Sequence, residues 1–340
     1  MYIQVKKTIF TKDVFNRVSE ATEDRLLNQR PLKQTSRRAF IQKTALGSAA
    51  TVLLPSCLGA ARPARAKNTV PISGHVWVYA SNFPPHWDCT PILESVFSDF
   101  RYAGMDGVEL MEGQLRHDDA VQRIGALSKK YGVPVTGSSY GVGLGMWDAS
   151  QHKSIIKDLE TVVPRLAQLG GTTFGISVGS KKETPKTEKE LDAQAYLLNI
   201  IRDRCKDHGI VANLHNHTYE VANDMHDLKG TLQRLPDFKL GPDINWLIRG
   251  GVDPLSFIET YGEQIVYLHL RDQYADGVWT EYVGQGSTDF GAIAAALRAK
   301  EFSGSCAVEL AFPAKFEPQL PLKKTWKKSR KYVERTFGWS

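Results

Sequence analysis

The stretch KLGPDINWLIRGGVDPLSFIETYGEQIVYLHLRD, residues 239–272, contains a strand, a helix and a second strand in succession. The runs Lys239–Asp243 and Ile265–Leu270 are short and mostly apolar, which is typical of buried strands, whereas Pro254–Tyr261 has helical periodicity. A strand, helix and strand in this order predict two parallel strands joined by a crossover helix.

The same alternation occurs along the chain on both sides of this stretch. Eight strands are predicted, at His75–Ala80, Gly107–Met111, Val133–Gly137, Thr172–Ser177, Ile210–His215, Lys239–Asp243, Ile265–Leu270 and Cys306–Leu310. Eight helices are predicted, at Pro91–Tyr102, Ala120–Tyr131, Ser154–Leu169, Glu188–His208, Asn223–Leu235, Pro254–Tyr261, Phe290–Lys300 and Lys323–Thr336. Eight such units predict a single (β/α)8 TIM barrel, whose usual size is about 250 residues. The competing doubly wound sheet would normally carry a GxGxxG motif after the first strand, where none is present.

Glycines follow five of these helices. A glycine in the left-handed conformation is a common way for a helix to end. The glycines concerned are Gly104, Gly132, Gly170, Gly209 and Gly262.

Charge is distributed unevenly along the 340 residues. Residues 1–66 contain 12 Lys plus Arg against 4 Asp plus Glu, whereas residues 67–340 contain 31 against 33. The net charge of +6 therefore comes from the first 66 residues, and the remainder lacks the basic surface that nucleic-acid binding needs. The four cysteines show no CxxC spacing, so neither a zinc ribbon nor a disulfide framework is indicated.

The segment SRRAFIQK, residues 36–43, resembles a twin-arginine export signal, and the apolar run Ala45–Leu54 has the length of a signal core. That run is shorter than the about 20 residues of a transmembrane helix. Cleavage after Ala66, or a lipid anchor on Cys57, would both fit. We therefore predict a signal region at 1–66, a barrel at 67–340, and a periplasmic, secreted or lipid-anchored protein. The alternative is an ordinary Ala-rich helix.

Polar side chains end four consecutive predicted strands. In a TIM barrel the active site lies at the C-terminal ends of the strands, so these side chains are expected to meet. Two imidazoles and two carboxylates suit one divalent ion such as Mn, Co, Zn or Fe, whereas Ca would need more oxygen ligands. The expected ligands are His215, Asp243, His269 and Glu309. For each of them, a hydrogen-bonded residue at the barrel rim is the alternative.

The segments GPDINWLIRGGVDP, IVYLHLRD, GQGSTDFGAIAAALRAKEFSG and CAVEL resemble the xylose isomerase-like TIM barrel family of sugar phosphate isomerases and epimerases. The resemblance runs from about His75 to about Leu310. It implies that Asp243, His269 and Glu309 bind the catalytic metal. The fourth family ligand is a glutamate at the end of strand 5, and His215 stands at that position here.

The replacement of this glutamate affects the expected chemistry. In the family's ketose epimerases, the glutamates of strands 5 and 8 also act as two bases on opposite faces of the substrate. Glu309 keeps that role by resemblance, and His217 or Glu220, in the loop expected after strand 5, would relay protons. Trp246 stands where those epimerases carry a histidine.

A sugar-binding pocket is predicted from aromatic residues near strands 1, 3 and 6. Aromatic faces pack against the apolar side of sugar rings, although about half of such residues are expected to be core. The candidates are Trp77, Tyr79, Trp87, Tyr140, Trp147 and Trp246, of which Trp87 and Trp147 lie in polar loops. Glu109 and Arg271 are expected to bind substrate hydroxyls, with structural ion pairing as the alternative.

The predicted function is therefore an exported, metal-dependent sugar isomerase or epimerase that removes a proton next to a carbonyl. A dehydratase or lyase acting on keto-glycosides or inositol-like substrates is the alternative, and a non-catalytic carbohydrate-binding barrel is a third possibility. Endonuclease IV shares the barrel but needs three zinc ions and histidines on strands 2 and 3, where this chain has Glu109 and Ser138–Ser139.

Overall fold

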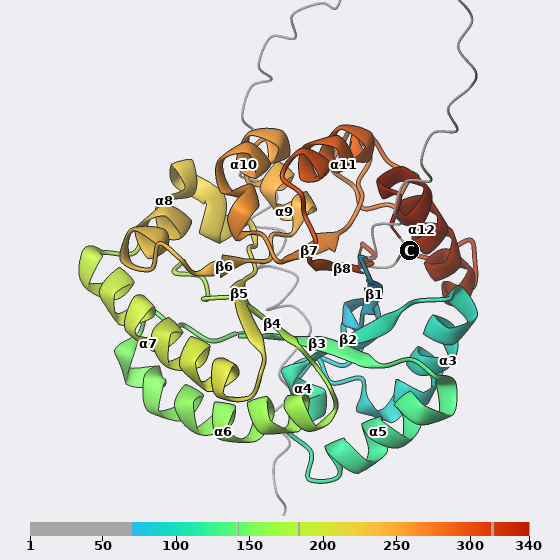
Figure 1. Ribbon diagram of the computed structural model, residues 1–340, viewed down its shortest axis with the longest axis horizontal. Coiled ribbons are helices and arrows are strands. Elements are labelled where there is room, and N and C mark those ends of the chain that lie inside the picture. The colour runs from blue at the N-terminus through green and yellow to red at the C-terminus, as the bar shows by residue number, and fades with distance from the viewer. Residues whose placement is uncertain (1–69, 142, 183, 314–315, 340) are drawn as a thin grey trace, which may run out of the picture. The chain divides into compact units, whose positions relative to one another are not determined.

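Parallel strands at the centre of the molecule form one eight-stranded sheet among the described residues, which in this computed structural model are 70–141, 143–182, 184–313 and 316–339. The strands are β1 Ile72–His75, β2 Gly107–Met111, β3 Val135–Tyr140, β4 Thr173–Ile176, β5 Val211–Leu214, β6 Lys239–Leu240, β7 Tyr267–Leu270 and β8 Ser305–Val308. Helices surround the strands on the outside (Figure 1). The predicted export signal, its cleavage sites and Cys57 lie outside the described residues.

The sheet closes on itself between its two ends, β6 and β7. Its strand order is β6-β5-β4-β3-β2-β1-β8-β7, with parallel pairing throughout. Two isolated parallel bridges, Leu240 with Ile265 and Asp243 with His269, join the ends. The His269 amide also donates to the Pro242 carbonyl at 3.0 Å. These bonds close the barrel, and the predicted (β/α)8 fold is confirmed.

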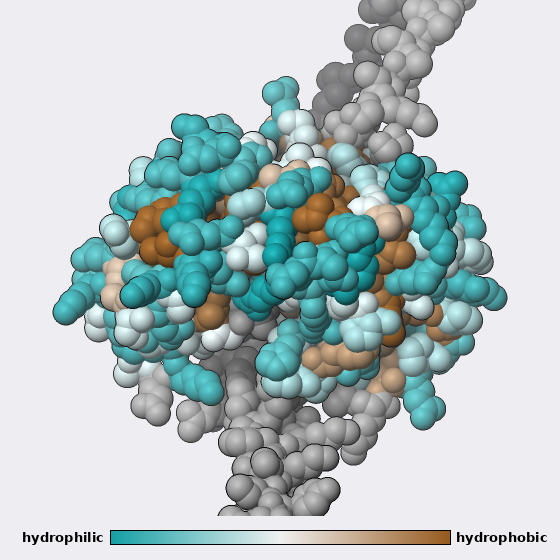
Figure 2. Space-filling model, turned by 90° about the horizontal axis from the view of Figure 1, so that it is seen from below, coloured by the Kyte–Doolittle hydropathy of each residue, from teal (hydrophilic) through white to brown (hydrophobic). Residues whose placement is uncertain are grey.

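Helices cover the barrel, and the longer ones are amphipathic. They are α2 Trp77–Ala80, α3 Leu93–Ala103, α4 Glu112–Leu115, α5 Ala120–Tyr131, α6 His152–Gln168, α7 Glu188–Asp207, α8 Thr218–Arg234, α9 Ile244–Arg249, α10 Pro254–Tyr261, α11 Phe290–Ala299 and α12 Leu322–Phe337. In α3, for example, Val96, Phe97 and Phe100 are buried on one side. The face shown in Figure 2 is mostly hydrophilic, with small hydrophobic patches. No helix within the described ranges is both long and apolar enough to cross a bilayer.

The first strand was predicted in the wrong place. Residues 75–80 were expected to be extended, but β1 ends at His75 and residues 77–80 form α2. The helical turn at 77–80 is stabilised by its own backbone bonds, such as Ser81 N to Trp77 O at 2.8 Å. As a result, His75 lies at the C-terminal end of β1, among the residues that face the catalytic side of the barrel.

Helix α8 also begins earlier than predicted, at Thr218 instead of Asn223. The Glu220 carboxylate accepts a hydrogen bond from the His217 amide at 2.7 Å, which caps the first turn. Non-helical backbone at residues 222–225 then interrupts the helix, so the periodic pattern is clear only after the interruption. Helices α4 and α9 are short and were not predicted.

Four of the five glycines expected to end helices are left-handed. Gly262 is the exception, because its φ of −53° continues α10 into a 3-10 turn. The other four have φ between 62° and 86°.

Gly179→Ala is expected to destabilise the barrel more than Gly170→Ala does. Both glycines have φ of 86°, but a Cβ on Gly179 would lie 1.7 Å from the Leu144 carbonyl oxygen, whereas nothing lies within 4 Å of one on Gly170. We expect about 1–2 kcal/mol for the left-handed alanine at 170 and about 1–3 kcal/mol more at 179. Urea unfolding of both variants measures this, and equal losses would contradict it.

Candidate functional site

The four predicted metal ligands lie at the C-terminal ends of neighbouring strands. His215, Asp243 and Glu309 directly follow or closely follow β5, β6 and β8, and His269 lies near the end of β7. All four are at most 6% exposed. Asp243 is also the N-cap of α9, because its Oδ1 accepts from the amides of Asn245 at 2.8 Å and Trp246 at 3.0 Å. This cap fixes the carboxylate at the end of β6.

Three of these residues form a group that suits a metal ion. Ligand atoms of His215, Asp243 and His269 lie within 4.8 Å of one another. The Nδ1 atoms of His215 and His269 are 2.8 Å apart, and Asp243 Oδ2 is buried without a hydrogen-bond partner. An orphaned carboxylate oxygen beside two converging ring nitrogens is an arrangement that a divalent ion of intermediate hardness would satisfy. The residues present therefore fit the predicted metal.

Glu109 contacts Nε2, the second ring nitrogen of His269. Its Oε2 is 2.6 Å from His269 Nε2 and accepts from the Tyr267 hydroxyl at 2.8 Å. Burial alone would lower the pKa of His269, but Glu109 raises that pKa to about 9. Burial and the charge of His269 hold the pKa of His215 well below its usual range. His269 therefore favours its protonated form and His215 its neutral form, and their Nδ1 atoms are in hydrogen-bond contact at 2.8 Å.

Glu109→Gln is expected to weaken metal binding by roughly 10–100-fold, the usual effect of losing a carboxylate that orients a ligating histidine. The glutamine keeps the size of the side chain but removes the charge beside His269 Nε2. Titration of the metal-free protein with Mn²⁺ measures the loss. Tyr267→Phe, which removes the other partner of the same oxygen, serves as the control and is expected to have a smaller effect; the reverse order would contradict the assignment.

A second group, His75, Glu109 and His269, also has ligand atoms within 4.8 Å. Its atoms are already hydrogen-bonded. The Trp77 amide donates to His75 Nδ1 at 3.2 Å, and His75 Nε2 lies 3.0 Å from the Ser139 hydroxyl. Glu109 and His269 are also hydrogen-bonded to each other. We therefore interpret this second group as the residues that hold His269 in position.

Glu309, the fourth predicted ligand, is paired with an arginine. Its Oε1 accepts from Arg271 Nη2, and its Oε2 is 3.4 Å from His269 Nδ1. Burial acts to raise the pKa of Glu309, but Arg271 and the nearby histidines lower it. For Asp243 the effect of burial is the larger one, and its pKa is raised. Glu309 is therefore held ionised beside the metal-binding group.

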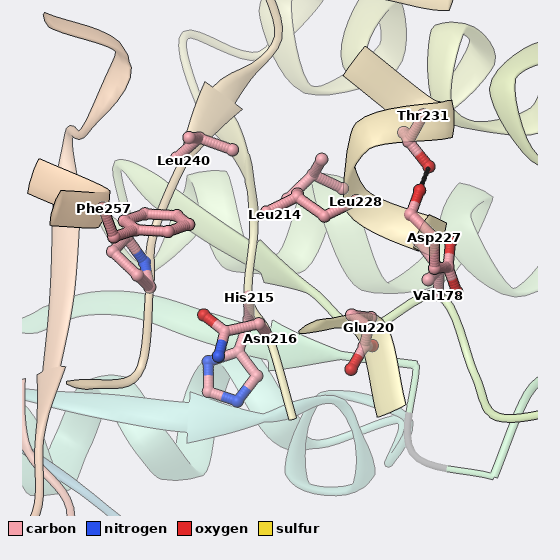
Figure 3. Close-up of a pocket in the computed structure, with 11 residues that line it drawn as sticks. Val178, Leu214, His215, Asn216, Glu220, Asp227, Leu228, Thr231, Leu240 and Phe257 are labelled. Carbon is pink, nitrogen blue, oxygen red and sulfur yellow. Dashed lines mark hydrogen bonds between the residues drawn. The ribbon is translucent and has the colours of Figure 1, made fainter. Parts of the chain in front are cut away.

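His217 and Glu220, the predicted proton relays, are at the start of α8. The half-buried ring of His217 lies 4.8 Å from that of His215 and stacks on Tyr219. Glu220 is buried, and burial together with Asp227 raises its pKa to about 8. Figure 3 shows it beside a cavity of about 10 Å³ between β5, β6 and α8, which has room for about one water molecule. The expectation that Glu220 lies in a loop is wrong, because it caps the helix.

The predicted substrate-binding residues have diverse surroundings. Arg271 lies under Trp246, with its guanidinium carbon 5.3 Å from the ring centre. Trp87 packs against Trp77 at 5.6 Å, and Lys181 lies over the half-buried Trp147 at 5.7 Å. Glu109 is 1% exposed and contacts His269, which leaves it almost no surface for a substrate. Among the other aromatic candidates, Tyr79 and Tyr140 are core residues.

A larger cavity of about 320 Å³ lies next to Tyr219 on the same side of the barrel. Its volume is within the range of small-molecule pockets. It lies between the loop after β4 and the first half of α8, with Lys181, Lys182, Tyr219, Asn223 and His226 among its lining residues. None of the five predicted substrate-binding residues lines either this cavity or the small one in Figure 3.

Sequence reasoning missed three residues of the site. His75 was predicted to begin the first strand, whereas it ends β1. It was therefore not considered among the residues at the C-terminal ends of the strands. Tyr267 lies within β7, two residues before His269, and its alternation with His269 indicates the same face of the strand. Trp279 comes from the loop after β7, where its ring lies 5.0 Å from the guanidinium carbon of Arg271, and no local pattern marks it.

A closed eight-stranded parallel barrel with polar side chains gathered at the C-terminal ends of its strands is the architecture of TIM barrel enzymes, whose active sites lie at that end. The family model described as xylose isomerase-like TIM barrel matches residues 97–336. The chain belongs to this family.

Solved structures share the fold at low sequence identity. A sugar phosphate isomerase/epimerase from Parabacteroides distasonis aligns with a TM-score of 0.64 and 16% identity over 82% of this chain and 98% of its own. D-allulose 3-epimerase from Methylomonas sp. gives 0.64 and 16% over 79% and 97%. The 3-keto-D-glucoside 4-epimerase of E. coli gives 0.61 and 16% over 78% and 100%. No curated protein sequence matches the chain significantly.

Proposed function

We propose that the protein is a metal-dependent sugar isomerase or epimerase that removes a proton next to the carbonyl of a keto-sugar. The observation that carries this proposal is the convergence of His215, Asp243 and His269 on one point, with the ionised Glu309 beside them. Family membership and structural neighbours that include sugar epimerases support it.

The residues have separate roles in this proposal. A bound divalent ion would polarise the substrate carbonyl and stabilise the negative charge that develops on its oxygen. Glu309 would accept the proton from the adjacent carbon, because Arg271 and the histidines keep it ionised. On the β5 side the ring of His217 lies 4.8 Å from that of His215 and is partly exposed, so it would relay a proton from solvent to the other face while Glu309 keeps the proton it removed. Trp246 would pack against the sugar.

A lyase reaction is the second candidate, and one observation favours it. The β5 end carries His215 where the family's epimerases have a second carboxylate base, and Glu220 is buried as a helix cap. With one carboxylate base, proton removal can be followed by loss of the substituent on the next carbon instead of return of the proton. Glu309 would take the same proton in both reactions.

The experiment is proton NMR in D2O with the purified protein loaded with Mn, Co, Zn or Fe(II). Substrates are D-allulose, L-ribulose and a 3-keto-D-glucoside. Deuterium entering next to the carbonyl, with appearance of an epimer, supports the isomerase, whereas release of the substituent supports the lyase. Glu309→Gln removes the base at nearly constant size and is expected to abolish exchange. Sugar binding without exchange, unaffected by a chelator, would instead indicate a carbohydrate-binding barrel.

We further propose export by the twin-arginine route, supported by the segment at residues 36–43 and the basic region before it. Residues 1–66 fused to a reporter are expected to direct export that is lost when Arg37 and Arg38 are both changed to Lys. Unchanged export would contradict the proposal. Mass spectrometry of the mature N-terminus distinguishes cleavage after Ala66 from acylation of Cys57.

A further inference from the structure

Helix α12, on the outside of the barrel next to α3 and α11, has a high density of positive charge (Figure 1). It contains seven of the 31 Lys and Arg residues of residues 67–340, but its one acidic residue is Glu334, out of 33 Asp and Glu residues in that range. The remainder of residues 67–340 therefore has 24 basic against 32 acidic residues. The nearly neutral total conceals a basic helix on an acidic barrel.

Six of these cations share the outer side of α12. At about 100° per residue, they fall within an arc of about 140° around the helix. The side chains of Trp326, Val333 and Phe337 are buried on the opposite side. The basic face consists of the exposed residues Lys323, Lys324, Lys328, Lys331 and Arg335 and the half-buried Lys327.

The basic face lacks carboxylate partners. In the part of the chain that the structure describes, the ion pairs of α12 all involve Arg330, at the edge of this face, which contacts Asp106 at 3.3 Å and Glu334 at 2.8 Å. On other helices exposed cations have such partners, as Lys130 has in Glu94. Like charges four residues apart, which recur along the basic face, repel one another and destabilise a helix. An external anion would relieve this repulsion.

Two tyrosine rings lie beneath lysines of the basic face. Lys323 and Lys327 Nζ are 5.3 Å and 4.8 Å from the ring centre of Tyr102 in α3, and Lys328 Nζ is 4.4 Å from that of Tyr282. Tyr102 is 43% exposed. Tyrosine is enriched where a membrane meets water, because its ring and hydroxyl suit the level of the lipid headgroups. The apolar side of α12 is packed against the barrel, so this helix could adsorb to a membrane by charge but not insert.

We propose that the basic face of α12 binds the protein to an anionic phospholipid surface. Clusters of about four to eight Lys and Arg on an amphipathic helix are typical of such binding. A protein partner fits less well, because protein interfaces are depleted in lysine and five of the six cations are lysines.

The choice of lipid over nucleic acid rests on the proposed export, which would place the protein beside membranes. The proposal is otherwise independent of the proposed function. Because α12 lies on the outer wall of the barrel, binding there leaves the C-terminal ends of the strands open to substrate (Figure 1).

The test is sedimentation of the full-length protein with vesicles of phosphatidylcholine, alone or mixed with phosphatidylglycerol. Binding to the mixed vesicles is expected at about 0.1 M salt and not at about 1 M, where the Debye length is about 3 Å instead of about 10 Å. A variant with four lysines of the basic face changed to Gln is expected to bind roughly 100-fold more weakly or less, because each basic residue near the surface contributes about fivefold. It removes repulsion within α12, so the helix should stay folded. The four changes are Lys324→Gln, Lys327→Gln, Lys328→Gln and Lys331→Gln.

A matched control carries the same four-charge change on the other side of the barrel (Figure 1). Both variants keep residues 1–66, so any binding by that basic region is common to them. The control is expected to bind within about fivefold of the wild type. Its changes are at exposed lysines of α6 and α7, Lys153→Gln, Lys157→Gln, Lys189→Gln and Lys206→Gln.

Equal losses in the two variants would show that net charge alone matters, and would overturn the proposal. Equal binding to uncharged vesicles, or no binding by the wild type, would do the same. If the basic face instead binds a DNA duplex, or mediates self-association, while the vesicles stay unbound, the partner is a nucleic acid or a second copy of the chain and the lipid proposal is wrong.

Discussion

Asp243→Asn is expected to lose its bound metal, with an affinity more than roughly 100-fold below that of the wild type, and to lose turnover with it. Asp243 supplies the one carboxylate of the metal-binding group, and its Oδ2 has no other hydrogen-bond partner. Asparagine still has an oxygen to accept from the amides of Asn245 and Trp246, so the start of α9 is preserved. Plasma mass spectrometry of the purified variant measures the metal content.

Glu220→Gln is the matched control for this loss. It makes the same change at a carboxylate that is also buried but lies outside the metal-binding group. The control is expected to retain the metal. Equal metal content in Asp243→Asn and the wild type would show that the ion, if present, is bound elsewhere.

Trp326→Ala is expected to reduce the free energy of unfolding by about 3–5 kcal/mol, the usual cost of removing a large buried aromatic side chain. Trp326 is fully buried in α12 and meets the Phe100 ring of α3 edge to face at 4.8 Å. Its Nε1 donates to the Tyr79 hydroxyl at 2.9 Å, so the truncation also leaves that hydroxyl without this partner. Equilibrium urea unfolding gives the value.

Trp326→Phe separates the contribution of apolar packing from that of the hydrogen bond. It keeps most of the apolar volume but loses the hydrogen bond to Tyr79, and is expected to cost clearly less than the alanine variant. If the two substitutions destabilise the barrel equally, the packing of Trp326 against α3 contributes little.

The strand order and the order of the site residues could be predicted because both depend on local pattern. Each parallel strand is a short apolar run, and the barrel brings the residues that end such runs to one side. Asp243 and His269 were predicted to lie on that side in this way, and they do. His75 was not, because the helical turn at Trp77–Ala80 has the same β-branched and aromatic composition as a strand.

The remaining errors come from tertiary contacts. A histidine at the N-cap of α8 is not the serine or threonine that marks a helix start, so the role of Glu220 as a cap was hidden. Arg271, which pairs with Glu309, also lies against Trp279, whose side chain donates to Asn245 of α9. Residues far apart in the sequence make these contacts, and periodicity carries no information about them.

The barrel is joined least extensively between β6 and β7, where isolated bridges replace a continuous ladder. Asp243 and His269 lie on opposite sides of this seam and pair across it. An ion bound by both residues would act as a staple, and would stabilise the closed form against local opening. Amide hydrogen exchange along the seam should then be slow in the metal-bound protein and faster after chelation. The ion would in that case stabilise the closed barrel as well as take part in its chemistry.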